Sequence, residues 1–288
     1  MANDKDKYQE ELNSLGMLFE YSRQLMLNIK EEQERVQTEW NIGQSCFAFI
    51  ACFEAVGNTL SMLPGSHIRS QFENTSFTVL SSNARIVFEG MLIVAYLLSE
   101  MTEEESEFRF KVWQYHAEKK RLIIARRFDS TSERLPKLEE DVEREAEEIR
   151  NHPQYGRLEK KTSGDIIRGA TDKALSKSEI EALVGFEPGY LTSTYKFLSQ
   201  YSHITSYATN QINEYGIDPT AIPTGLAVVL RMMIYSYSYV IKRLVDVLEV
   251  ENVPEEVRNT IDLYVDLAES FGEFSVDDPD DQPIEDQD

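Results

Sequence analysis

The sequence predicts an all-α fold, an up-and-down bundle of six to eight helices with a polar insertion before the helix that carries His203. Apolar residues recur every three to four positions over most of the 288 residues, which is the period of an α-helix. No long segment alternates apolar and polar residues as a half-buried β-strand does. With 41% apolar residues, we expect one helical domain over residues 1–274 that buries a sizeable core.

The first two predicted helices differ in how their apolar residues are distributed. Residues 5–38 carry charges at most turns and one thin apolar stripe, which is typical of a long helix that lies on a core. That stripe suits a homodimer interface as well as docking within one chain. Residues 41–63 are apolar nearly all round, so we expect this helix to be surrounded by others. Pro64 and Gly65 then end it.

The middle of the chain predicts one more apolar helix and two charged ones. The helix that carries Arg85 runs to about Ser99. Thr102 followed by Glu105 matches a capping box and predicts a helix over 103–128. Residues 133–151 are dominated by charge, so we expect an exposed helix there.

Residues 153–189 are expected to form a flap or insertion, because five glycines interrupt a polar stretch. Ser178 followed by Glu181 is a second capping signal and predicts a short helix near 178–184. The stretch is locally basic, and its basic residues either attract a phosphate-bearing ligand or belong to a solvated loop. These residues are Arg157, Lys160, Lys161, Arg168 and Lys173.

Three helices and a tail complete the chain. We expect helices over about 189–213 and 220–249, and a last amphipathic helix with Pro254 in its first turn. Residues 275–288 contain seven acidic residues and no basic one. Such a composition predicts a disordered acidic tail.

The overall charge limits the choice of partners. There are 29 basic and 51 acidic residues, which give a formal net charge of -22. This charge repels nucleic acid and anionic lipid at long range, so we expect neither a broad DNA-binding face nor a membrane partner. A basic protein that binds the acidic surface is compatible with it.

Cysteine and histidine usage points to a cytoplasmic protein without metal or cofactor. Cys46 and Cys52 lie six apart in a helical pattern, so they point to different sides and are expected to be reduced, buried thiols. The N-terminal residues lack the pattern of a signal peptide. The longest apolar runs are interrupted by the charged residues Glu54, Glu89 and Arg231, which argues against a membrane-spanning helix. The four histidines are far apart and no glycine-rich phosphate loop is present.

Two polar stripes interrupt the least polar helices and form the candidate site. Ser81, Arg85 and Glu89 are spaced four apart, so they share one face of their helix. Far along the chain, the same spacing recurs in Tyr195, Ser199 and His203. A buried charge without a partner costs several kcal/mol, so we expect the two stripes to face each other. Arg231, Tyr235 and Tyr239 form a third stripe of this kind.

Each stripe residue is assigned a role. Arg85 is the candidate for binding an anionic group, with Glu89 orienting its guanidinium, and His203 is the candidate general acid or base. We treat these three as candidate catalytic residues, and the candidate ligand-binding residues are Ser81, Tyr195, Ser199 and Arg231. The alternative is that Arg85 and Glu89 form an intrahelical pair that only fixes the core register.

One further pair matches a ribonuclease spacing. Arg109 and His116 are separated by six residues, as in the Arg and His motif of HEPN ribonucleases. Chance alone gives roughly 0.7 such matches in a chain of this composition. Four glutamates surround Arg109, which favours a solvated, salt-bridged start of a helix.

At the two stripes the chain resembles an uncharacterised bacterial family of all-helical proteins with an Arg-x-x-x-Glu helix and a later Tyr-x-x-x-Ser-x-x-x-His helix. The resemblance covers roughly residues 40–245, and where the family often has glycine after the histidine, this chain has Ile204. That family is loosely similar to HEPN bundles, which implies a role in defence or toxin systems. The matching residues are Ala84, Arg85, Phe88 and Glu89, then Tyr195, Leu198, Ser199 and His203.

Two functions of different classes remain open. The first is a protein that binds or processes a phosphate-containing ligand, RNA or a nucleotide, in a polar pocket between the two stripes. The second is a noncatalytic interaction protein whose polar stripes are structural and whose acidic surface and tail engage a basic protein.

Overall fold

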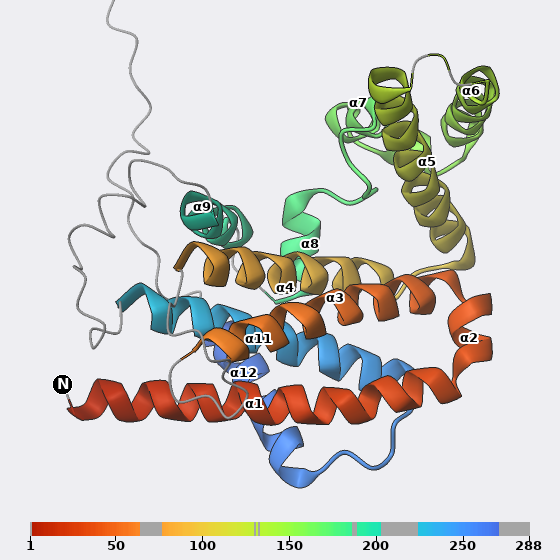
Figure 1. Cartoon of the computed structure of the whole chain (residues 1–288). Helices are drawn as coiled ribbons and strands as arrows, with labels where there is room; N and C mark the ends of the chain where they lie inside the picture. Colours follow the sequence, from red (N-terminus) through yellow and green to blue (C-terminus); the bar gives the residue numbers. More distant parts are fainter. Residues whose placement is uncertain are drawn as a thin grey trace, which may run out of the picture.

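The computed structural model describes residues 2–63, 77–129, 131, 133–185, 189–202 and 224–270 (Figure 1). These residues form eleven α-helices and one short 3₁₀ helix and contain no β-strand, so the all-α prediction is confirmed. The helices outnumber the six to eight expected, partly because short helices such as α2 and α7 do not stand out in the apolar pattern. In chain order they are α1 (Ala2–Glu31), α2 (Gln33–Thr38), α3 (Trp40–Met62), α4 (Phe77–Leu97), α5 (Glu103–Phe128), α6 (Leu135–Asn151), η1 (Tyr155–Arg157), α7 (Lys160–Arg168), α8 (Lys177–Leu183), α9 (Tyr190–Ser202), α11 (Thr224–Val247) and α12 (Glu255–Ser270).

Helix α4 is the centre of the main bundle (Figure 1). It packs against α3 and α11 along its length and against α8 and α9 on another side. Helix α1 contacts α3 and α11, and α12 covers α1 and α11. The main hydrophobic core follows from this arrangement, because α3 and α4 are apolar nearly all round while α1 contributes one buried leucine stripe.

A glycine lets α3 and α4 approach closely. A Cβ at Gly90 of α4 would overlap the Sγ of Cys52 on α3. Cys52 is fully buried, and its thiol donates weakly to the carbonyl of Val87 at 3.8 Å. The contact between the two central helices therefore depends on the missing side chain at position 90.

A second hydrophobic cluster lies outside the bundle. Helices α5, α6 and α7 with η1 surround it, and they form a lobe that projects from the end of α4 (Figure 1). The residues expected to form one flap, 153–189, divide between the clusters, because α7 packs in the lobe while Ile180 of α8 belongs to the main core. The buried members of the lobe cluster are Phe108, Val112, Tyr115, Leu122, Val142, Ala146, Ile149, Ile166 and Ala174.

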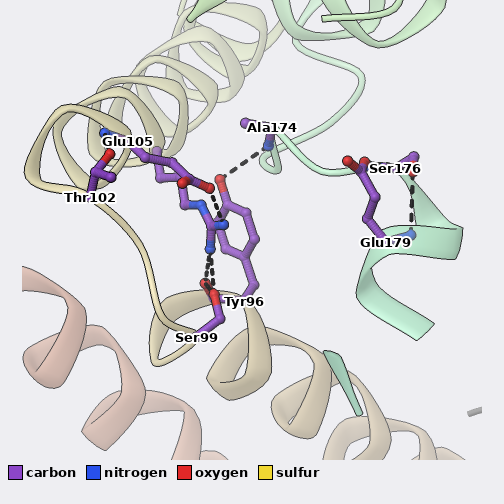
Figure 2. Close-up of polar contacts among 8 residues, drawn as sticks. Tyr96, Ser99, Thr102, Glu105, Ala174, Ser176 and Glu179 are labelled. Atoms are coloured by element: carbon purple, nitrogen blue, oxygen red, sulfur yellow. Dashed lines mark hydrogen bonds and ion pairs between the residues drawn. The ribbon is translucent and has the colours of Figure 1, made fainter. Parts of the chain in front are cut away.

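Local capping signals predicted two helices, α5 and α8, and misplaced the capping pair of α8. Helix α5 begins after Thr102, whose side chain accepts a hydrogen bond from the Glu105 backbone N–H at 3.2 Å, so the range 103–128 is confirmed. Helix α8 is capped by Ser176 and Glu179, two residues before the pair we expected (Figure 2). Glu181 instead accepts a hydrogen bond from the backbone N–H of Gly189 at 3.0 Å. Both serines match the capping pattern, and only tertiary contacts distinguish them.

Several expected segments reach beyond the described residues. The helix expected over 189–213 is described as far as Ser202. His203, Ile204 and the acidic tail 275–288 lie outside the described residues, so the expected disorder of the tail stays a prediction.

Two helices are long and apolar enough to cross a membrane, a property that the core helices of soluble proteins share. Helices α3 and α4 contain segments, Trp40–Met62 and Thr78–Leu97, that are long and apolar enough to cross a membrane in spite of Glu54 and Glu89. In the fold, 44% and 56% of these apolar windows are buried against other helices, as the core helices of a soluble protein also are. The cytoplasmic location stays a prediction.

The cysteines behave as expected. Cys46 and Cys52 are both free and buried, which confirms two reduced thiols without a mutual disulfide. Burial raises the pKa of the Cys46 thiol to about 11 and that of the Cys52 thiol to about 12. Both remain protonated near neutral pH and act as small apolar core groups.

Substituting Gly90 with alanine should destabilise the bundle. We expect Gly90→Ala to lower the free energy of unfolding by about 1–3 kcal/mol, because the added methyl group overlaps the Cys52 sulfur. Urea unfolding followed by circular dichroism measures the change. Gly156→Ala is the matched control, since nothing lies within 4 Å of the new methyl group. An equal loss in a Cys52→Ala background would contradict the overlap as the cause.

Candidate functional site

The two predicted polar stripes meet where α4 packs against α9. The Arg85 Nε donates to the Glu89 Oε1 at 2.9 Å, and its Nη2 donates to the hydroxyl of Tyr195. The centre of the guanidinium also lies 4.5 Å from the centre of the Tyr195 ring, a cation–π distance. Tyr195 of the α9 stripe thus binds Arg85, the central residue of the α4 stripe, through both its hydroxyl group and its ring.

This group lies at the surface, and the enclosed centre we expected is not formed by these three residues. The side chains of Arg85 and Glu89 are 27% and 45% exposed, and Tyr195 is 39% exposed. The Arg85 guanidinium lies beside the Tyr195 ring and is partly exposed to water, which lowers the cost of keeping the ion on an apolar helix.

The charge of Arg85 is secure. The hydrogen bond to Glu89 raises the pKa of Arg85 above its ordinary value; burial opposes this rise, and the electrostatic attraction of Glu89 and Tyr195 adds to it. The site therefore presents a permanently positive, oriented guanidinium at the edge of the bundle.

The remaining stripe residues lie in different environments. Ser81 is fully buried one turn before Arg85, and its Oγ has no hydrogen-bond partner in the part of the chain that the structure describes. Ser199 is half-buried on α9, one turn after Tyr195. His203 follows the last described residue of α9, so its predicted role as acid or base stays a prediction.

Arg231 does not join this group. Its Nε donates to Glu11 of α1, and Glu11 is buried there, so Arg231 faces α1 and not α9. The hydroxyls of Tyr235 and Tyr239 donate instead to the carbonyls of Val184 at 3.3 Å and Leu183 at 3.4 Å. The third predicted stripe is therefore structural, since it ties α11 to α1 and to the C-terminal end of α8.

Among the described residues, the most buried charged side chain is one that the sequence pattern did not indicate. We expected Arg109 to be a solvated residue at the start of a helix, but it is only 3% exposed. Its guanidinium donates to the Tyr96 carbonyl at 2.6 Å, the Ser99 Oγ at 2.7 Å and the Glu105 carboxylate (Figure 2). It also lies 4.9 Å from the centre of the Tyr96 ring.

The Tyr96 hydroxyl extends this cluster to a third segment. It accepts a hydrogen bond from the backbone N–H of Ala174 at 3.0 Å, in the connection between α7 and α8 (Figure 2). Burial raises the pKa of Tyr96, so the hydroxyl stays neutral. The cluster of Arg109, Tyr96, Ser99 and Glu105 joins α4 to α5 and to the chain that returns from the lobe.

The Arg109 cluster is structural in character. The Nη1 and Nη2 of Arg109 bind the Tyr96 carbonyl, Ser99 and Glu105, and its Nε is buried without a partner among the described residues, whereas a catalytic arginine needs donors that face a substrate. His116 is half-buried further along α5, and its Nδ1 has no hydrogen-bond partner among the residues described. The geometry does not favour the Arg109 and His116 pair as a ribonuclease centre.

Two grooves lie elsewhere on the described surface. One, of about 410 Å³, lies between α5 and α6 and is lined by acidic and basic residues together. The other, of about 350 Å³, lies between α1 and the connection from α11 to α12 and is strongly acidic. Within the described ranges, no group of three histidine, cysteine, aspartate or glutamate residues has metal-binding geometry.

Comparison with known proteins adds no relative. No protein-family model, no curated protein and no solved structure matches this chain. The function is therefore inferred from the geometry of the Arg85 group and of the grooves.

Arg85 and Arg109 each pair with a glutamate four positions away in the same helix, but their substitution should change stability by different amounts. We expect Arg109→Gln to lower the free energy of unfolding by about 3–5 kcal/mol, because it leaves the half-buried Glu105 carboxylate and the buried Tyr96 carbonyl without their charged donor. Arg85→Gln should cost less than about 1 kcal/mol, since its pair reaches water. Urea unfolding of both variants measures the difference. Equal losses of unfolding free energy would contradict the prediction that Arg109, and not Arg85, stabilises the fold.

Proposed function

We propose that the protein binds a phosphate-bearing ligand, a nucleotide or RNA, at the edge where α4 meets α9. The observation that carries the proposal is the state of Arg85. Of its five N–H donors, Glu89 and Tyr195 accept two, and no described residue accepts the other three. An oriented guanidinium with free, partly exposed donors is suited to a phosphate group.

The surroundings of Arg85 support an anionic ligand. Helix α9 carries a single charged residue in its described length, the exposed Lys196 next to Tyr195. Hydroxyl side chains make up much of the remaining helix. With Glu89 opposing Arg85, the group keeps a net charge of about +1 in a protein of net charge -22.

Processing of the ligand would require His203. His203 lies eight residues after Tyr195 in the sequence, a spacing that on a helix puts both residues on one face, so the proposal assigns the imidazole to the same ligand. It would then act as general acid or base on a group held by Arg85. A place in a defence or toxin system is what the family resemblance implies and belongs to this proposal.

Binding assays with the full chain test the site. We expect a nucleotide panel or total RNA to contain a ligand that wild type binds, and we expect Arg85→Met to weaken it at least about tenfold through loss of a charge-assisted contact. Arg23→Met is the matched control, because Arg23 also pairs with a glutamate of its own helix but lies on α1. Isothermal titration measures both, and turnover of the ligand in His203→Ala tests the enzymatic form. Binding that is absent, or equal in Arg85→Met, would reject the proposal.

The acidic groove favours the second function, a noncatalytic partner of a basic protein. Its lining contains four glutamates and no basic residue, together with amide side chains and Tyr21. A lysine or arginine side chain of a partner would fit this volume and charge. The four acidic residues are Glu31, Glu32, Glu249 and Glu251.

Neutralising glutamates of the acidic groove distinguishes binding of a basic protein from binding of a phosphate-bearing ligand. We expect Glu31→Gln combined with Glu251→Gln to weaken binding of a lysine-rich peptide about fivefold, while phosphate-ligand binding stays unchanged. Glu103→Gln with Glu104→Gln removes the same charge from the exposed start of α5 and is the control. Fluorescence anisotropy of the labelled peptide measures the affinity. Equal losses in the two variants would show that net charge and not the groove attracts the peptide.

A further inference from the structure

Exposed apolar side chains gather at the end of α5. Ile123, Ile124 and Phe128 are 46%, 58% and 79% exposed. They are three of the twelve large apolar side chains exposed on the described residues, and they fall within six positions. This end of α5 lies at the side of the lobe that faces away from the bundle (Figure 1). Apolar surface concentrated in this way is typical of a contact with another body.

Basic side chains surround this apolar group. Residues 119–128 include five lysines and arginines and no acidic residue. Arg121 and Arg126 pair with Glu118 at 2.8 Å and with Glu139 at 2.7 Å. Lys120 and Arg127 have no carboxylate partner among the described residues, and the Arg127 guanidinium lies 5.9 Å from the centre of the Phe128 ring.

Helix geometry places the apolar and the free basic residues on one outward face. Lys120, Ile124 and Phe128 are spaced four apart, and Arg127 lies three after Ile124. The opposite face carries Leu122, which is buried in the lobe core. We name this outward face, made of Lys120, Ile123, Ile124, Arg127 and Phe128, the α5 tip.

The lobe that carries the α5 tip is nearly neutral in charge. Residues 103–174 contain 16 basic and 17 acidic residues, a net charge of -1. The rest of the chain therefore carries -21 of the total of -22. The expectation of no membrane contact rested on the total charge, whereas screening at physiological salt limits each charge to a range of about 8 Å.

We propose that the α5 tip docks on an anionic lipid surface, with the side chains of Ile124 and Phe128 at the acyl boundary and those of Lys120 and Arg127 at the phosphate headgroups. Lysines and arginines beside exposed isoleucine and phenylalanine are the pattern of helices that lie in a membrane interface. A single-stranded nucleic acid would instead require several stacked aromatic rings, and Phe128 is the aromatic residue of the tip.

Vesicle sedimentation of the full chain tests the proposal. We expect wild type to sediment with vesicles of equal parts phosphatidylglycerol and phosphatidylcholine at about 0.1 M NaCl, and to be released at about 1 M NaCl, where the screening length falls to about 3 Å. Vesicles of phosphatidylcholine alone should retain little protein. Phe128→Ser should lower the partition coefficient about tenfold, and Lys120→Glu with Arg127→Glu should lower it at least about tenfold.

Matched variants on the bundle control for hydrophobicity and net charge. Leu263→Ser removes a side chain on α12 that is 56% exposed. Arg23→Glu with Lys30→Glu makes the same change in net charge on exposed positions of α1. Both should bind as wild type does, and thermal unfolding verifies that all four variants are folded.

Four outcomes would overturn the proposal. These are no sedimentation with the anionic vesicles, equal losses in tip and control variants, RNA binding at the tip in place of vesicle binding, and self-association that Phe128→Ser abolishes while vesicles are not bound. The last outcome would assign the tip to a second copy of the chain.

Discussion

At the C-terminal end of α4, the last carbonyl groups have no partner within the helix, and two arginines from other helices supply the missing donors. Arg109 of α5 donates to the Tyr96 carbonyl, and Arg243 of α11 donates to the Leu98 carbonyl. Because Arg109 also binds Ser99 and Glu105, it connects the end of α4, the turn after it and the first turn of α5. The position of the lobe, and with it the α5 tip, depends on this buried guanidinium.

The sequence predicts those features of the fold that are local. The helical period reveals α3 and α4, and Thr102 marks the first residue of α5 because its cap involves neighbours three positions away. The Arg109 cluster cannot be found in this way, since Ala174 is 78 residues from Tyr96. The acidic residues around Arg109 indicate a solvated helix, and one of them, Glu105, is instead the partner that allows its burial.

The candidate site shows the same limit. Periodicity puts Arg85 and Tyr195 on faces that we expected to enclose them, and packing of α4 against α9 brings them into contact at the surface. It does not say how far a long side chain extends. Arg85 extends to the surface, and Arg231 extends to α1, while the tyrosines on the same face as Arg231 reach α8. Residues that share a face therefore need not share a site.

The uneven distribution of charge between bundle and lobe has a consequence for encounters with other molecules. Among the described residues, the bundle carries 12 basic and 22 acidic side chains and the lobe carries 16 and 17, so the negative charge is displaced from the lobe toward the bundle. Within a screening length of a negatively charged surface, repulsion of the bundle is stronger than repulsion of the lobe, so the molecule rotates until the lobe faces that surface before any contact forms. The fold thus selects the orientation of approach, and it does so without requiring the chain to be basic.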